Sequence, residues 1–343
     1  MQASKDMDIQ KKDISGNTDP ERKKSGTHKI WFRAAAFAMV VLLLLVAAGK
    51  LCDPIRLGLQ DSVSERERYL LHLLSEPEDM VDVAVLGDSE SYTAVSAYQL
   101  WKDAGIASYI GGQSGQWIGE SYFCLKKILK RQSPKVLILE TNEFFSRGDA
   151  SVIRDAAKSA QELAQQMFPI LKYHRFWKME TADSKLQTKV FNGFQLRTAV
   201  APYTGGAYMH ATAEKTPVTF ITRYYLEAIK DLCDAHGTKL LLMTAPSPAN
   251  HTMQRHNAVQ ELADKLGVPY LDLNLNTEEL GIDWNLDTLD GGDHINYNGC
   301  RKVTVYLQQY LQAHYTLPDR RKDARYEAWN KRAAEFEKLL PQT

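Results

Sequence analysis

The longest apolar run of the chain lies near its N-terminus. Ala34 to Gly49 is a stretch of sixteen positions without a charged side chain, and apolar residues continue on either side of it. Sixteen helical residues reach ~24 Å, and the flanks extend this towards the ~30 Å of a hydrocarbon layer if Arg33 and Lys50 direct their charges to the interfaces. We therefore predict a transmembrane anchor over residues 30–52.

The polar residues before the anchor indicate its orientation. Residues 1–29 are lysine-rich and scattered with Ser, Gly, Asn and Pro, which is typical of a disordered tail. No acidic residue lies between positions 22 and 33. Five basic residues lie there: Arg22, Lys23, Lys24, Lys29 and Arg33. The positive-inside rule then predicts a single-pass protein of the cell membrane with a cytoplasmic N-terminus and everything after residue 52 outside the cytoplasm. A cleaved signal peptide is the alternative, but "VAAGK" is a weak cleavage site.

Beyond a connector at residues 53–80, which holds one helical segment ("SERERYLLHLL"), short apolar runs alternate with amphipathic segments. The apolar runs, predicted as strands, are residues 81–86, 106–110, 135–140, 240–244 and 268–274. The segments with helical periodicity are residues 96–105, 119–132, 219–237 and 256–267. Continuous apolar strands between helices indicate a parallel sheet covered on both faces. The predicted fold class is α/β, a three-layer α/β/α domain with a mostly parallel five-stranded sheet in the flavodoxin-like order 2-1-3-4-5.

Residues 146–216 interrupt this alternation and predict an insertion or lid. A helical segment ("SVIRDAAKSAQELAQQM") is followed by a run rich in aromatic residues, which we expect to pack the insertion onto the main domain rather than to bind a ligand. These residues are Tyr173, His174, Phe176, Trp177, Phe191, Phe194, Tyr203 and Tyr208. The main domain then covers residues 81–316 with the insertion at about 146–216. Residues 317–343 form a charged C-terminal tail with one helix.

Charge and cysteine usage exclude several classes of protein. The 42 basic and 42 acidic residues balance, which gives no reason to expect a nucleic-acid partner. The four cysteines, Cys52, Cys124, Cys233 and Cys300, are far apart and do not have zinc-site spacing, so unpaired buried thiols are favoured over a disulfide. His251 and His256 match no metal pattern and are interpreted as surface residues. We expect neither a metal nor an organic cofactor.

Polar residues follow the first three predicted strands. Gly87-Asp88-Ser89 comes directly after the first, and this position alone is equally typical of a helix cap. Gly112 follows the second strand and Asn142 the third. In the order 2-1-3-4-5 the carboxyl ends of these strands meet at one edge of the sheet, where α/β proteins bind ligands. A serine nucleophile would then lie beside an oxyanion hole made by the backbone N–H groups of Ser89 and Gly112 and the Asn142 amide.

His294, in "LDGGDHINYNG", supplies the general base that this arrangement requires. Its Nε2 must face the serine while an acid reaches Nδ1. Asp290 lies four positions before it and Asp293 lies next to it. We favour Asp290, because the intervening pair of glycines lets the chain curl back, and Asp293 is the alternative. A capping or core histidine is the competing interpretation of His294.

The four blocks GDSES, GGQSG, ETNE and DHINYNG, in this order across residues 81–300, resemble the SGNH (GDSL-like) hydrolase family. Two departures stand out. Glu140 and Glu143 replace the Gly and Asp that are usual in the third block, and position 291 is glycine where the family has its acid. "LETNEFF", "DHINYNG" and the anchor are most similar to envelope-anchored members, including the D-alanine transfer protein of teichoic acid and alginate-type O-acetylation proteins, which work beside membrane-bound O-acyltransferases.

The resemblance implies a membrane-anchored, extracytoplasmic serine esterase or O-acyltransferase. Its substrate would be an acylated glycan, with acetyl as the expected acyl group, in a polysaccharide of the cell envelope. A membrane-bound O-acyltransferase is the implied protein partner. Two alternatives stay open: a non-catalytic partner of such an acyltransferase, and a glycan-binding module that uses the aromatic insertion.

Overall fold

Five short apolar strands build the centre of the molecule. In the computed structural model, which describes residues 20–51, 53–145, 151–173 and 190–341, the strands lie in the order β2-β1-β3-β6-β7 and all pair in parallel. They are β1 Val83–Leu86, β2 Ser108–Ile110, β3 Val136–Glu140, β6 Lys239–Thr244 and β7 Tyr270–Asp272. Nearly all of their side chains are buried, because helices cover both faces. The predicted fold class is confirmed.

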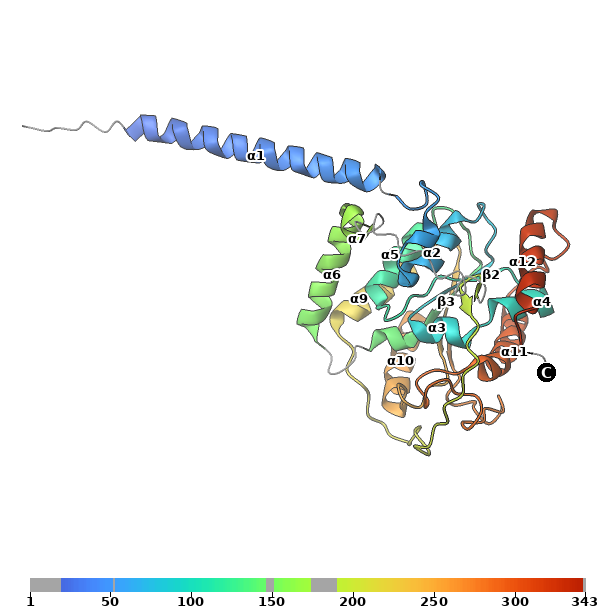
Figure 1. The fold of residues 1–343 in the computed structure, drawn as a ribbon. Coiled ribbons are helices and arrows are strands. Elements are labelled where there is room, and N and C mark those ends of the chain that lie inside the picture. Colours follow the sequence, from blue (N-terminus) through green and yellow to red (C-terminus); the bar gives the residue numbers. More distant parts are fainter. Residues whose placement is uncertain (1–19, 52, 146–150, 174–189, 342–343) are drawn as a thin grey trace, which may run out of the picture.

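Two groups of helices make the outer layers (Figure 1). One group contains α3 Ser89–Ala94, α4 Ala97–Ala104, α11 Tyr297–His314 and α12 Glu327–Glu337. The other contains α2 Glu65–Ser75, α5 Ile118–Ile128, α9 Phe220–His236 and α10 Met253–Leu266. Their ends follow from the sequence. In α4 the Ser96 side chain accepts from the Gln99 N–H, and Gly105 ends the helix in the left-handed region at φ 64°.

Helix α11 differs from the sequence expectation, which assigned no helix between His294 and the C-terminal tail. It begins at an Asn296 cap, whose side chain accepts from the N–H groups of Asn298 and Gly299. Its inner face, including Val303, Leu307 and Leu311, is buried against the sheet and the neighbouring helices.

The connector and the C-terminal segment are both part of the packed body. Leu73 of α2 is completely buried. At the other end of the chain a short 3₁₀ turn, Ala324–Tyr326, leads into α12, and the Tyr326 and Trp329 rings pack on Trp101 at centroid distances of 5.6 and 5.3 Å. Arg320 donates two hydrogen bonds to Asp82, beside β1. Residues 317–341 therefore complete the core, although their charge suggested a separate tail.

The interrupting segment contains α6 Val152–Met167, α7 Ile170–Tyr173 and a two-stranded hairpin, β4 Val190–Phe191 with β5 Phe194–Gln195. Phe191 and Phe194 are each only 1% exposed, and both rings contact Phe336 of α12. Tyr203 and Tyr208 pack on Trp284. These four aromatic residues attach the segment to the body, as predicted. His174, Phe176 and Trp177 lie outside the described residues.

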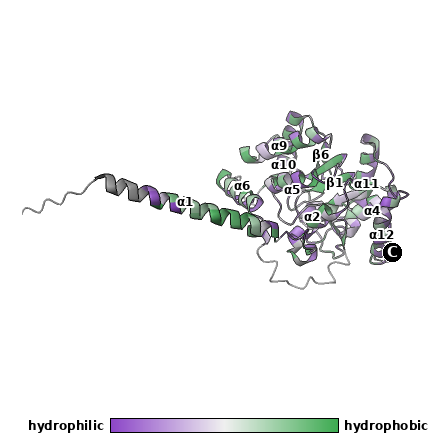
Figure 2. Ribbon diagram, turned by 90° about the horizontal axis from the view of Figure 1, so that it is seen from above, coloured by the Kyte–Doolittle hydropathy of each residue, from purple (hydrophilic) through white to green (hydrophobic). Residues whose placement is uncertain are grey.

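Helix α1, Pro20–Leu51, extends away from the body (Figure 1). Its section His28–Leu51 has a mean hydropathy of 2.4, is not buried, and is long and apolar enough to cross a membrane. A signal sequence passes the same test of length and composition. Figure 2 shows the apolar part of α1 next to the body.

The described cysteines, Cys124, Cys233 and Cys300, are unpaired and buried, as expected. Cys52 lies outside the described residues.

Candidate active site

The turn after β1 places Ser89 at the carboxyl edge of the sheet. The strand ends at Leu86, Gly87 adopts φ 144°, and Asp88 caps α3 by accepting a hydrogen bond from the Glu90 N–H at 3.0 Å. Ser89 is the first residue of that helix. A Cβ at Gly87 would lie 2.5 Å from the Cβ of Glu140 on the adjacent strand β3, so the tight turn requires glycine here.

His294 lies directly beside Ser89. Its Nε2 is 2.8 Å from the Ser89 Oγ, and its Nδ1 is 2.7 Å from Oδ2 of Asp290. The other Asp290 oxygen accepts from the His294 backbone N–H at 2.7 Å. With Nδ1–H donating to the carboxylate, Nε2 is left as the acceptor for the serine hydroxyl.

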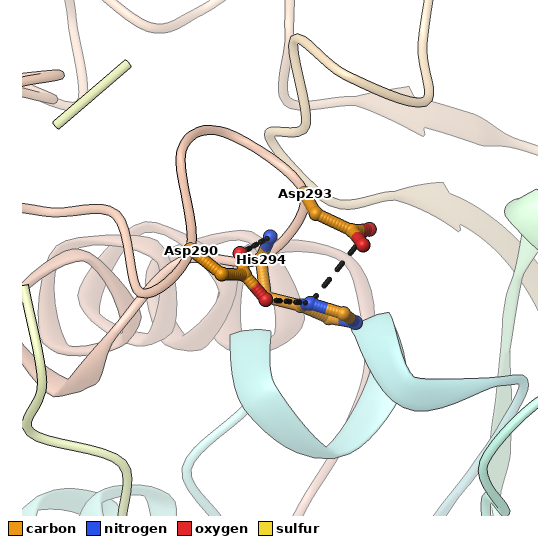
Figure 3. A group of neighbouring side chains, drawn as sticks. All are labelled: Asp290, Asp293 and His294. Carbon is orange, nitrogen blue, oxygen red and sulfur yellow. Dashed lines mark hydrogen bonds and ion pairs between the residues drawn. The ribbon is translucent and has the colours of Figure 1, made fainter. Parts of the chain in front are cut away.

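The two carboxylates near His294 are not equivalent (Figure 3). Gly291 and Gly292, with φ of 76° and 98°, turn the chain so that Asp290 returns to the imidazole. The Asp293 carboxylate stays 3.7 Å from Nδ1, beyond hydrogen-bond distance. The structure thus places the favoured acid, and not the alternative, in line with His294 and Ser89.

Asp290, Asp293 and His294 are also close enough to share a metal ion, since one ligand atom of each lies within 4.8 Å of the others. Both ring nitrogens of His294, however, already have partners in Ser89 and Asp290. The arrangement therefore fits proton transfer better than metal ligation.

The Asn142 side chain is fixed at both of its polar ends. Its Nδ2 donates to Asp88 Oδ2 at 2.8 Å, and its Oδ1 accepts from Arg255 at 2.9 Å. This pattern sets the orientation of the amide and leaves one Nδ2–H for another acceptor. The residue lies in a short 3₁₀ turn, Thr141–Phe144, directly after β3.

Gly112 is buried against the turn that carries Ser89. A Cβ there would lie 2.1 Å from the Ser91 Oγ and 2.8 Å from the Gly87 carbonyl oxygen, so only glycine fits. The next residue, Gln113, donates from its backbone N–H to the same carbonyl at 3.1 Å. The structure thus brings all four predicted positions, Ser89, Gly112, Asn142 and His294, to one edge of the sheet.

Buried glutamates surround these residues. Glu90 and Glu140 are at most 2% exposed, and burial, reinforced by the neighbouring carboxylates, raises the pKa of each well above the ordinary value. Burial also raises the pKa of Glu143, whose side chain accepts from Ser121 at 2.5 Å. The two glutamates that depart from the family pattern, Glu140 and Glu143, are therefore parts of the interior.

A cleft of about 500 Å³ opens beside Ser89. Trp117 lines this cleft, and the loop 245–248 after β6 is not among its lining residues. Two basic side chains of the lining lie over aromatic rings: Lys158 of α6 over Trp117, and Arg255 of α10 over Phe145. Its lining includes Asp88, Ser89, Trp117, Asn142, Phe145, Arg154, Lys158, Asn250, Arg255 and Asp293.

Two sequence interpretations in this region were wrong. His251, only 3% exposed, and His256 both hydrogen-bond to Oδ2 of the buried Asp272, at 2.9 and 2.7 Å, so neither is a free surface residue. Burial alone would raise the Asp272 pKa, but the hydrogen bonds from the two histidines hold it well below its ordinary value.

Two residues that order the site, Arg255 and Asn250, were not expected from the sequence. Arg255 holds the Asn142 amide. Asp88, expected to bond local backbone N–H groups, accepts from the Glu90 N–H and also links the Asn142 amide to the serine turn. Asn250 donates to Glu90 at 2.8 Å and also to Asp293. In the sequence, Asn250 belongs to the sequon Asn-His-Thr and Arg255 to "HTMQRH", and neither pattern indicates a role in the site.

Comparison with known proteins gives distant neighbours. No family model matches the chain, and no curated protein matches it. A solved structure from Bacteroides fragilis, named an acylhydrolase, is 14% identical with a TM-score of 0.37, covering 73% of this chain and 96% of that one. Another from Parabacteroides merdae, named a GDSL-like lipase, is 11% identical with a TM-score of 0.35, covering 69% and 97%.

Proposed function

We propose that the protein is a serine-dependent esterase or O-acyltransferase of the SGNH type. The observation that carries the proposal is the continuous hydrogen-bonded series Ser89–His294–Asp290, with 2.8 and 2.7 Å between successive side chains. A nucleophile held by a base that is itself oriented by a carboxylate is the arrangement of acyl-transfer enzymes.

The first half of the reaction forms an acyl-enzyme. His294 accepts the Ser89 proton while Oγ attacks the ester carbonyl, and Asp290 stabilises the imidazolium that results. The free Nδ2–H of Asn142 and the backbone N–H groups of Ser89 and Gly112 are the donors for the tetrahedral oxyanion. His294 then gives its proton to the leaving alcohol as the carbonyl re-forms.

The second half transfers the acyl group to an acceptor. His294 deprotonates either water or a sugar hydroxyl, which attacks the acyl-serine and releases Ser89. The same residues serve both acceptors, so hydrolysis and transfer differ only in what occupies the cleft. Its polar lining beside the Trp117 ring suits a sugar, which offers hydroxyl groups and an apolar face.

We place this chemistry outside the cytoplasm, at a membrane to which α1 anchors the body. The support is the exposed apolar section His28–Leu51 and the basic residues before it. An acylated polysaccharide of the envelope, with acetyl as the acyl group, is the proposed substrate class.

The test is covalent labelling of the full chain in detergent with a fluorophosphonate, alongside hydrolysis of p-nitrophenyl acetate. Wild type should be labelled at Ser89 and should hydrolyse the ester, and Ser89→Ala should lose both properties. Ser75→Ala, whose hydroxyl lies at the end of α2, is the matched control and should behave as wild type. Equal ester hydrolysis by wild type and Ser89→Ala, without labelling, would instead identify a non-catalytic partner of an acyltransferase.

A further inference from the structure

Helix α6 separates apolar from polar residues along its whole length. At 3.6 residues per turn, one side has only apolar residues and the other has charged, amide and hydroxyl side chains. The apolar side comprises Val152, Ile153, Ala156, Ala157, Ala160, Leu163, Ala164 and Met167. The polar side comprises Arg154, Asp155, Lys158, Ser159, Gln161, Glu162, Gln165 and Gln166.

The orientation of α6 is the reverse of that of an ordinary surface helix, because its apolar side faces outward. Ile153 is 85% exposed and Met167 65%, whereas Asp155 and Glu162 are only 3% and 5% exposed. Asp155 receives a hydrogen bond from the Thr219 hydroxyl at 2.6 Å, which ties the polar side to the start of α9. A soluble helix normally buries its apolar stripe, and a contiguous exposed one marks an interaction surface.

The position of α6 relative to α1 indicates what covers this surface. The turn between α6 and α7 contacts the end of α1, since a Cβ at Gly49 would lie 3.0 Å from the Pro169 Cδ. Both views place α6 on the side of the body from which α1 extends, and in Figure 1 α6 runs across the direction of α1. If α1 crosses a bilayer, α6 therefore lies along its surface.

We propose that the apolar side of α6 is a second membrane contact, inserted into the outer surface of the bilayer that α1 spans. Interfacial helices of this kind bury their apolar face ~5–10 Å into the headgroup region. The sixteen residues of α6 span ~24 Å, which is enough for a continuous strip of contact. This proposal rests on the anchorage proposed for α1, and it is independent of the acyl chemistry.

The same helix connects the membrane contact with the candidate active site. Lys158, on its polar side, lines the cleft, and its Nζ lies 5.8 Å from the centre of the Trp117 ring. With α6 on the bilayer, the membrane contact and one wall of the cleft belong to the same helix.

The test is site-directed spin labelling of the full chain, with Cys52→Ser, in nanodiscs that hold one copy. Labels at Ile153→Cys and, separately, Met167→Cys report on α6. A label at Val40→Cys in α1 reports anchorage, and one at Gln309→Cys on the exposed side of α11 is the aqueous control. Collisions with oxygen, which enriches in lipid, are compared with those of a water-soluble nickel chelate.

We expect the labels at 153 and 167 to favour oxygen, as the label at 40 does, with the reverse preference at 309. A preference for the nickel chelate at 153 and 167, with oxygen favoured at 40, would overturn the proposal while leaving the anchor intact. Protection of 153 and 167 from both reagents would also overturn it, because protein rather than lipid would then cover the helix. Ser89-dependent ester hydrolysis is a separate readout, so failure here is distinguishable from failure of the proposed activity.

Discussion

At the scale of single residues, the choice between Asp290 and Asp293 is decided by geometry that spacing alone left open. Asp290 contacts both Nδ1 and the backbone N–H of His294, whereas Asp293 instead accepts a hydrogen bond from Asn250. We expect Asp290→Asn to lower kcat steeply, by up to about 10⁴-fold, as the equivalent change does in a known serine protease. Asp293→Asn should lower it far less. Steady-state hydrolysis of p-nitrophenyl acetate checks this order, and a larger loss in Asp293→Asn would contradict it.

Arg255 is a positioning residue for Asn142, because its guanidinium holds the amide oxygen. Asn142→Ala should lower kcat about 10²–10³-fold, the cost of one oxyanion donor in a known serine enzyme. Arg255→Met should lower kcat about tenfold with little change in KM, because the Asn142 side-chain amide would then be free to rotate. If Arg255 acts through Asn142, its loss should have no further effect on kcat in the Asn142→Ala background. A full additional loss in the double variant would mean that Arg255 acts on the substrate directly.

Ser89, Gly112 and Asn142 were predictable because each lies within three residues of the end of an apolar strand, so the sheet order was enough to bring them together. His294 and Asp290 follow no strand, and they were predicted from the block "DHINYNG" and the glycine pair before it. Arg255 and Asn250 lie around the start of α10 and reach the site only through side-chain conformation, which neither spacing nor periodicity encodes.

At the scale of elements, the turn between β1 and α3 depends on close approach to β3. Gly87→Ala should destabilise the protein by about 3 kcal/mol or more, since a Cβ would lie 2.5 Å from the Glu140 Cβ in addition to the unfavourable φ. Gly115 also has a positive φ but has open space around it, so Gly115→Ala should cost only about 1–2 kcal/mol. Urea denaturation of the two variants measures the difference, and equal costs would refute the steric argument.

The sheet and most of its helices were predictable because their periodicity is strong. The ends of the strands were less predictable than their centres. The strand predicted over residues 268–274 is only Tyr270–Asp272 in the structure, because it lies at the edge of the sheet and pairs with one neighbour. Helix α11 was missed because the polar cap Asn296 and the following Tyr-Asn-Gly are typical of a turn, and the apolar positions of its buried face begin only afterwards.

At the scale of the whole molecule, the buried carboxyl groups make stability depend on pH. Burial raises the pKa of Glu143 well above 4.5, so the folded protein binds a proton that the unfolded chain releases. The stabilisation that comes from this extra bound proton is complete at a pH below the ordinary pKa of 4.5. It is lost as the pH rises through the raised pKa of the folded protein. The free energy of unfolding should therefore fall as the pH rises above about 4.5 and through the raised pKa of Glu143, with each unit of pKa difference worth about 1.4 kcal/mol.

Glu143→Gln, which mimics the neutral carboxyl, should flatten this fall. The exposed Glu335→Gln should leave it as in wild type. Urea titrations across the pH range measure both slopes. A slope in Glu143→Gln as steep as in wild type would show that Glu143 is ionised in the folded protein.

The aromatic contacts of α12 have a practical consequence for the choice of fragment boundaries. Composition suggests trimming a soluble version at residue 316. Such a fragment would leave Trp101 and Tyr98 facing water, because Trp329 and Phe336 cover them. It would also lose the guanidinium of Arg320 that neutralises the buried Asp82. A version meant for crystallisation should retain the chain to at least residue 341, with any affinity handle placed beyond it.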